Sequence, residues 1–94
     1  MAQDAMKNIV IENSFKKDLK RLQKRDYHFR ALYNIIELLK YNNNFPRNAR
    51  PHKLKGEYQG FWECHIENDW LLIYQITETE LLLLRTGSHS DLFE

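Results

Sequence analysis

The sequence has little of what several common protein classes require. Its single cysteine, Cys64, excludes an internal disulfide and a cysteine-rich zinc site. It has three glycines and neither a glycine-rich phosphate loop nor a nucleophile elbow, which disfavours nucleotide hydrolysis. No apolar run approaches the ~18–20 residues that span a bilayer, and residues 1–8 lack the apolar stretch of a signal peptide. We therefore expect a cytoplasmic protein.

What is present is typical of a small globular domain. The 94 residues are 43% hydrophobic and 29% charged, which is enough apolar material for one core. We expect residues 1–94 to form one domain. Residues 1–5 are expected to lie outside the fold, and Met6 is a candidate start.

The net charge of +1 hides a strong asymmetry. Residues 1–55 carry 13 Lys or Arg against 5 Asp or Glu, whereas residues 56–94 carry one Arg against 8 acids. The basic part could contact nucleic-acid phosphates. It could equally be the solvated surface of a helix.

Local patterns predict an α+β fold with the order β-α-α-β-β-β, an antiparallel sheet with a helical hairpin packed on one face. Phe15, Leu19 and Leu22 follow helical spacing behind a candidate cap at Ser14. A second helical pattern covers residues 27–41. β-branched, aromatic and leucine residues predict strands at residues 9–11, 58–66, 70–77 and 80–86.

Two-residue turns at Glu67–Asn68 and Glu78–Thr79 would set the strand register. Counting from these turns puts His65 opposite Trp70 and gives each strand a core face and an outer face. The predicted core face holds Trp62, Cys64, Ile66, Leu71, Ile73, Leu82 and Leu84. The outer face holds an apolar area that we expect to meet a partner, made of Phe61, Tyr74, Ile76, Leu81 and Leu83.

Five polar residues could carry chemistry. An imidazole both accepts and donates protons near neutral pH. Gly87 would let the chain turn sharply, so that His89 folds back towards Arg85. Arg85, the only arginine of the acidic half, could bind a phosphate or form an ion pair with Glu63. The histidines and the aspartate could instead bind zinc, although their spacing is not characteristic of a zinc site. The five residues are His52, His65, Asp69, Arg85 and His89.

Three motifs in series resemble the YafQ branch of the RelE/ParE toxin superfamily. They are PHKLKG at residues 51–56, HIENDWLLIY at 65–74 and RTGSHSDLF at 85–93. The resemblance implies a toxin of a type II toxin–antitoxin system with a RelE-like fold. It implies a ribosome-dependent endoribonuclease that cuts mRNA in the A site without a metal or other cofactor. It also implies neutralisation by a cognate antitoxin of the ribbon-helix-helix type.

The resemblance also implies roles for individual residues. A ribose 2′-hydroxyl would attack the adjacent phosphorus, leaving a 2′,3′-cyclic phosphate and a 5′-hydroxyl. His89 would be the general acid, His52 or His65 with Asp69 the base, and Arg85 the stabiliser of charge on the phosphate. The expected RNA-binding residues are Trp70, Phe93, Lys53 and Lys55.

Two other functions fit the same scaffold. One is a ParE-like toxin that inhibits gyrase without catalysis, although such a protein is not expected to carry this set of histidines. The other is a catalytically inactive module that binds another protein.

Overall fold

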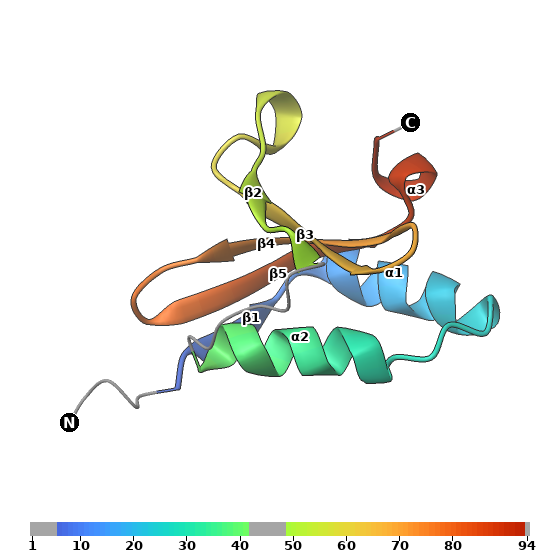
Figure 1. Ribbon diagram of the computed structural model, residues 1–94, viewed down its shortest axis with the longest axis horizontal. Coiled ribbons are helices and arrows are strands. Elements are labelled where there is room, and N and C mark those ends of the chain that lie inside the picture. The colour runs from blue at the N-terminus through green and yellow to red at the C-terminus, as the bar shows by residue number, and fades with distance from the viewer. Residues whose placement is uncertain (1–5, 42–48, 94) are drawn as a thin grey trace.

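The computed structural model describes residues 6–41 and 49–93, so the expectation for residues 1–5 falls outside the described part of the chain. Within these ranges, two α-helices precede the main strands, and a third, short α-helix follows them (Figure 1). The elements are β1 (Asn8–Ile11), α1 (Asn13–Lys24), α2 (Arg30–Lys40), β2 (His52–Lys53), the 3-10 helix η3 (Gly56–Tyr58), β3 (Trp62–Glu67), β4 (Trp70–Ile76), β5 (Glu80–Gly87) and α3 (His89–Phe93).

The strands form one sheet in the order β1-β5-β4-β3-β2. This arrangement confirms the predicted fold class and element order, with two corrections. First, β1 runs parallel to β5, so the sheet is mixed rather than antiparallel throughout. The helical hairpin supplies the long connection that places the first strand beside the last. Second, β2 and α3 were not predicted, because segments of two and five residues are too short to show a period.

The helical hairpin covers one face of the sheet, as predicted (Figure 1). α1 buries Phe15 and Leu22, and α2 buries Leu32 and three further apolar residues. The predicted cap at Ser14 is wrong, because α1 begins after Glu12 and has no side-chain cap. The Ser14 hydroxyl instead donates a hydrogen bond to the carbonyl of Leu84 at 2.6 Å, which ties α1 to β5.

The sheet separates two apolar clusters. The larger lies under the hairpin, and the smaller lies on the outer face, where α3 and the segment from β2 to η3 are found (Figure 1). Buried Leu92 of α3 packs in the outer cluster together with Leu71 and Ile73 of β4. The outer face of the sheet is therefore partly covered by α3 and by the segment from β2 to η3.

The first turn of the meander lies one residue later than predicted. Glu67 pairs with Trp70, so the turn residues are Asn68 and Asp69, and Asn68 has the positive φ of 46° that asparagine tolerates. The second turn is confirmed, because the Thr77 amide donates to the carbonyl of Glu80 at 2.9 Å. A one-residue slip exchanges the two faces of a strand.

This slip overturns the predicted outer apolar area. Tyr74, Leu81 and Leu83 are at most 2% exposed and lie in the core under the hairpin. Leu71 and Ile73, predicted to lie under the helices, are buried on the opposite face instead. Ile76 packs at the edge of that core and Phe61 packs against the outer cluster, so the five residues do not form one exposed partner surface.

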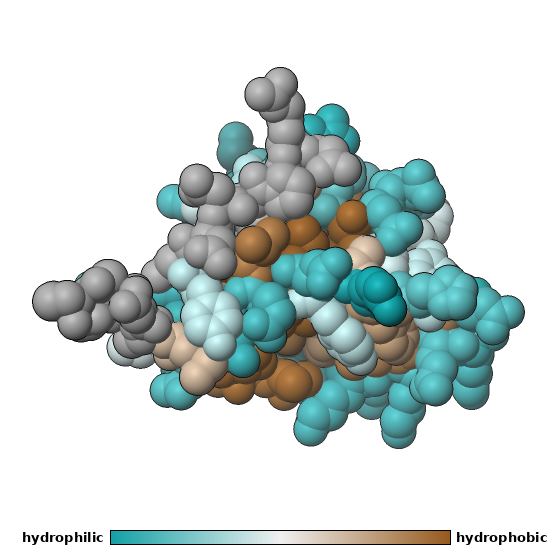
Figure 2. All heavy atoms as spheres, turned by 60° about the horizontal axis from the view of Figure 1, so that its bottom comes forward, coloured by the Kyte–Doolittle hydropathy of each residue, from teal (hydrophilic) through white to brown (hydrophobic). Residues whose placement is uncertain are grey.

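The helical side of the molecule is largely hydrophilic (Figure 2), with apolar surface visible between the polar side chains. Among the described residues, no helix is long and apolar enough to cross a bilayer. The large apolar side chains that remain exposed in the described ranges are Met6, Ile9, Ile11, Tyr33, Tyr41 and Phe93. Of these, Phe93 belongs to α3, beside several of the predicted site residues.

Candidate active site

Two rows of paired residues cross the outer face of the sheet. One row joins His52, Glu63, Ile73 and Arg85 on four successive strands, and the next joins His65 through Leu71 to Gly87. Paired residues point to the same side, and neighbouring strands lie ~4.8 Å apart. The ends of the first row are therefore ~14 Å apart at the backbone, and those of the second ~10 Å.

Helix α3 places His89 at the end of the second row. The chain leaves β5 at Gly87, where a Cβ atom would lie 2.9 Å from the Cβ of Asp91, so only glycine fits without a shift. The Ser88 hydroxyl then accepts from the Asp91 amide at 3.1 Å, and the Asp91 carboxylate accepts from the Ser88 amide at 3.0 Å. This reciprocal capping pair starts the helix. The prediction that the chain turns back after β5 is confirmed.

His89 faces Asp69 across the end of the meander. One carboxylate oxygen of Asp69 accepts from the His89 backbone amide at 3.1 Å and lies 3.3 Å from its ring Nδ1. Both side chains are more than 60% exposed, so a substrate can reach them. A carboxylate at one ring nitrogen orients the imidazole and leaves the other nitrogen free for a proton transfer. Asp69 is thus placed to orient His89, whereas the sequence had paired it with the base.

His52 has a different carboxylate partner. Its Nε2 lies 3.0 Å from Glu63, whose side chain is only 5% exposed, while the imidazole itself is half-exposed. A pairing of Glu63 with Arg85 was one of the two roles expected for that arginine. In the structure Glu63 pairs with His52 instead, because the two residues are direct neighbours on β2 and β3.

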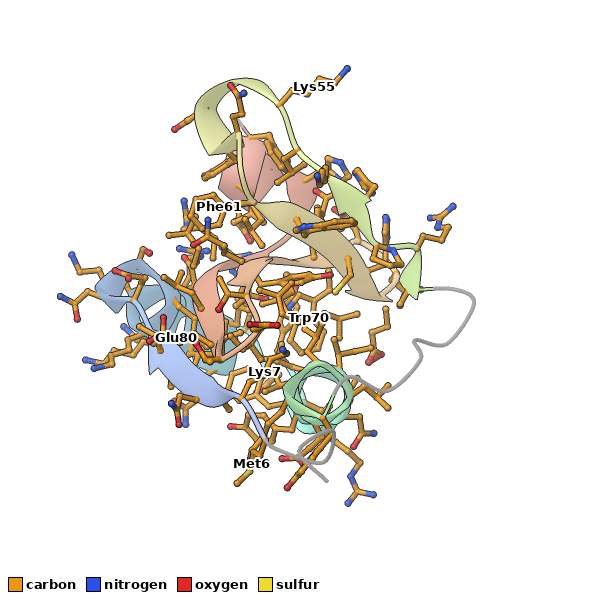
Figure 3. The ribbon with its side chains drawn as sticks, turned by 90° about the vertical axis from the view of Figure 1, so that its left-hand side faces the viewer. Met6, Lys7, Lys55, Phe61, Trp70 and Glu80 are labelled. Atoms are coloured by element: carbon orange, nitrogen blue, oxygen red, sulfur yellow. The ribbon has the colours of Figure 1, made fainter. Side chains whose placement is uncertain are left out.

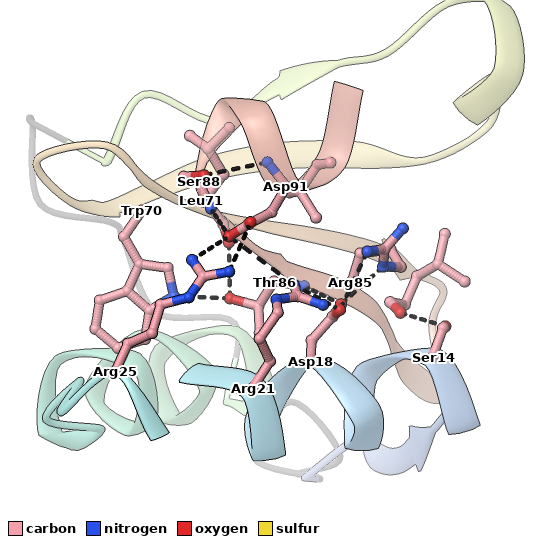
Figure 4. A network of polar contacts seen from close by, with 12 residues as sticks. Ser14, Asp18, Arg21, Arg25, Trp70, Leu71, Arg85, Thr86, Ser88 and Asp91 are labelled. Atoms are coloured by element: carbon pink, nitrogen blue, oxygen red, sulfur yellow. Dashed lines mark hydrogen bonds and ion pairs between the residues drawn. The ribbon is translucent and has the colours of Figure 1, made fainter. Parts of the chain in front are cut away.

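Arg85 is anchored by a buried acid from α1. Its Nε and Nη2 donate to the two carboxylate oxygens of Asp18 at 2.7 and 3.1 Å (Figure 4). Its Nη1 donates to the Tyr58 hydroxyl at 3.3 Å. The hydrogen bond to Asp18 raises the pKa of Arg85, against the opposing effect of partial burial. A guanidinium has five N–H donors, and three are used here. The two that remain, on Nη1 and Nη2, could bind a phosphate.

Aromatic rings connect these groups. The rings of Phe93 and His89 are 5.6 Å apart, and Phe93 meets Tyr58 at the same distance in an edge-on contact. Tyr58 in turn holds Arg85. Asp69, His89, Phe93, Tyr58 and Arg85 therefore form one continuous chain of contacts along α3. Phe93 remains 43% exposed, which leaves ring surface for a base.

Trp70 is a correction to the predicted RNA-binding set. It is 4% exposed and lies between the sheet and the helical side (Figure 3), with its indole against Tyr27 at 4.8 Å and near Phe29. Its Nε1 donates to the Thr86 hydroxyl at 2.9 Å. The register slip puts Trp70 on the inner face, so it has no free face on which a base could stack.

The remaining predicted residues lie farther from α3. His65 is half-buried on β3, in the row that leads to Gly87. Lys53 and Lys55 are exposed. Lys53 lies 5.7 Å above the Trp62 ring, and Lys55 extends from the loop between β2 and η3 (Figure 3). Burial raises the pKa of the Cys64 thiol to about 12, so it is no candidate nucleophile.

Sequence reasoning missed two members of the site, Asp18 and Tyr58. Asp18 did leave a signal: it lies three residues after Phe15 and four before Leu22, on the apolar stripe of a helix whose other charged residues are basic. An acid on such a stripe needs a buried cation. Tyr58 left no comparable signal, because its role depends on the path of the loop after β2.

Comparison with known proteins decides the family. Residues 7–94 match the model of the bacterial toxin of type II toxin-antitoxin system, YafQ. The chain belongs to the YafQ toxin family. The mRNA interferase toxin YafQ of Escherichia coli K12 is 37% identical over 89 residues, which cover 93% of this chain and 96% of that protein. The putative toxin YafQ of Haemophilus influenzae is 29% identical over 82 residues, which cover 80% of this chain and 76% of that protein.

Solved structures agree with this assignment to the YafQ family. YafQ in the E. coli DinJ–YafQ toxin–antitoxin complex matches with a TM-score of 0.87 and 34% identity, over 96% of this chain and 100% of that one. A metal-bound toxin from Helicobacter pylori matches with a TM-score of 0.86 and 40% identity, over 94% and 100%. The predicted family, the RelE-like fold and the enzyme class, an endoribonuclease, are confirmed.

The ligand geometry does not fit a metal site in the part of the chain that the structure describes. Within residues 6–41 and 49–93, no three His, Cys, Asp or Glu side chains are grouped so that they could hold an ion. The zinc alternative fails on this arrangement, because His52 and His89 are each paired with a different carboxylate.

Asp91 gives α3 a dependence on pH. Partial burial by itself would raise the pKa of Asp91, but hydrogen bonds from Arg25 and Ser88 lower it to about 2. A lowered folded-state pKa means that this stabilisation is complete above the unfolded-state pKa of ~3.9 and is lost as pH falls towards 2. We expect Asp91→Asn to cost about 1–2 kcal/mol at pH 7 and almost nothing at pH 2. Urea denaturation of both proteins at several pH values measures this, and a difference that stays constant with pH would contradict it.

Proposed function

We propose that this protein is a ribosome-dependent mRNA interferase that acts in the cytoplasm and is neutralised by a cognate ribbon-helix-helix antitoxin. It would cut mRNA in the ribosomal A site by attack of a ribose 2′-hydroxyl on the adjacent phosphorus. The observation that carries the proposal is the continuous set of contacts from Asp69 through His89 and Phe93 to Arg85. The YafQ relatives and the DinJ–YafQ complex support both the activity and the antitoxin.

The reaction needs an acid, a base and a cation. His89, oriented by Asp69, protonates the departing 5′-oxygen, and the free donors of Arg85 bind the charge that develops on the phosphate. The 2′-oxygen–phosphorus bond forms as the bond to the 5′-oxygen breaks. The products are a 2′,3′-cyclic phosphate and a 5′-hydroxyl.

We assign the base to His65, with His52 as the alternative. His65 lies in the row that ends at Gly87, two residues before His89, whereas His52 lies on an edge strand and its Nε2 already contacts Glu63. A base and an acid on opposite sides of one phosphodiester need to be close together. Lys53 and Lys55, together with exposed lysines of α1, would contact ribosomal RNA, and Phe93 would stack on a base.

The assignment of the base predicts a difference between two variants. We expect His65→Ala to lower kcat about 100-fold and to remove the acidic limb of the pH–rate profile, because that limb reports deprotonation of the base. We expect His52→Ala to retain both limbs. Single-turnover cleavage of a ribosome-bound message measures the profiles. Loss of the acidic limb in His52→Ala, but not in His65→Ala, would identify His52 as the base.

The overall proposal is tested with purified protein, translating ribosomes and a reporter mRNA. We expect cleavage within the coding sequence, 2′,3′-cyclic phosphate ends, and no loss of activity with a chelator. Free mRNA without ribosomes should stay intact. Intact mRNA together with inhibited gyrase would favour the ParE-like alternative, and no effect in either assay would favour an inactive binding module.

A further inference from the structure

α3 carries two proposed functional residues, His89 and Phe93, although it is only five residues long. A helix of five residues is not stable in isolation. Leu92 anchors it in the outer cluster, and the Leu92 carbonyl accepts from the Tyr58 hydroxyl at 3.3 Å. One apolar anchor sets the depth of the helix on the sheet, but it leaves the rotation of the helix about its axis to other contacts.

Those other contacts converge on Asp91, which meets Arg21 of α1 and Arg25, the residue that follows α1. Arg25 donates from Nη1 and Nη2 to the two carboxylate oxygens, both at 3.1 Å, and Arg21 lies 3.9 Å away (Figure 4). The Asp91 side chain is only 12% exposed. A paired carboxylate and guanidinium in this two-contact geometry fix orientation as well as distance. We call the Arg25–Asp91 pair the α3 clamp.

The α3 clamp is connected to the backbone at the start of the helix. The Asp91 oxygen that Arg25 Nη1 contacts also accepts from the Ser88 amide at 3.0 Å. His89 is the next residue, and its amide and ring both reach Asp69. Because the His89–Asp69 pair is largely exposed, it is too weak to hold α3 in place by itself.

We propose that Asp91, held by Arg25, is a positioning residue that sets the orientation of His89 and Phe93 towards the RNA. The proposal rests on the function proposed above for His89. Its distinctive consequence is that loss of the clamp changes catalysis more than binding. A misplaced acid lowers the rate of the chemical step, whereas the basic surface of the protein still collects the substrate.

The test combines kinetics with hydrogen exchange in Asp91→Asn and Arg25→Ala. Asparagine keeps the size of the side chain and can still accept from Ser88, so the variant mainly removes the ion pair. We expect kcat to fall about 10- to 100-fold with KM nearly unchanged. We expect the α3 amides, including Leu92, to exchange faster, while the amides of β4 keep their protection. The double variant should be no worse than either single one, because both remove the same interaction.

Glu37→Ala is the matched control, since it breaks an ion pair with Lys40 on the surface of α2. It should change neither kcat nor α3 exchange. The proposal is overturned if α3 exchange is unchanged in Asp91→Asn, or if exchange rises and kcat does not fall. Failure of the proposed function looks different, because wild-type protein would then leave mRNA intact on ribosomes. The exchange measurement would still decide whether the clamp holds α3.

Discussion

His89→Ala is expected to lower the rate of mRNA cleavage by about 100- to 10,000-fold, the range for loss of a general acid. The side chain is 61% exposed and contacts Asp69 and the Phe93 ring rather than the core. Its removal should therefore leave the fold intact, and the affinity for the cognate antitoxin should change little. Single-turnover cleavage on ribosomes measures the first effect, and calorimetric titration with the antitoxin measures the second.

The control for this experiment is His28→Ala. His28 is also exposed, but it lies in the connection between α1 and α2 and belongs to no proposed catalytic contact. We expect it to keep full activity. Equal losses of cleavage and antitoxin binding in His89→Ala, or a fall in its urea midpoint, would mean that His89 supports the structure rather than the reaction.

Asp18→Asn is expected to produce the largest loss of stability, about 3 kcal/mol. The Asp18 carboxylate is 2% exposed. It accepts hydrogen bonds from the Arg85 side chain and, at 3.0 Å, from the Thr86 amide, and it lies 2.9 Å from the Arg21 guanidinium. Removing its charge leaves two guanidinium groups with reduced compensation at the boundary of the core. Both arginines keep some contact with water, so the loss lies at the low end of the range for buried ion pairs.

Urea denaturation compares Asp18→Asn with Asp26→Asn. Asp26 is an exposed acid just beyond the same helix with a φ of 63°, a conformation that asparagine also adopts readily. The control should change the free energy of unfolding by less than about 0.5 kcal/mol. Similar values for the two variants would show that the ion pair of Asp18 and Arg85 contributes no more than a surface contact.

Asp18→Asn also bears on the reaction. Arg85 offers a phosphate two donors only while Asp18 holds the other edge of the guanidinium. A buried carboxylate thus sets the direction of the cation that the sequence had nominated for charge stabilisation. Its partner lies 67 residues away in the chain, so no local motif could reveal the pair.

Local periodicity predicted most of the secondary structure. The stripe of Phe15 and Leu22 and the alternation along β3 are properties of a single segment. The strand predicted from residue 58 begins only at Trp62, because residues 56–58 form the 3-10 helix η3. The three motifs indicated the family, because their order and spacing are properties of the chain itself. The sequence also nominated His89, Asp69 and Phe93, which the fold brings together.

The sequence by itself determined which segments are helices and strands, the charge asymmetry and the family, since all of these depend on residues read along the chain. Only the tertiary structure decided the register of β3 against β4, and with it the burial of Trp70 and of the expected partner surface. It also decided that β1 joins β5 and that Asp18 meets Arg85. The physical reason is that one bulge, between His65 and Glu67, exchanges the faces of the following strands. Packing against the helices selects between the two registers.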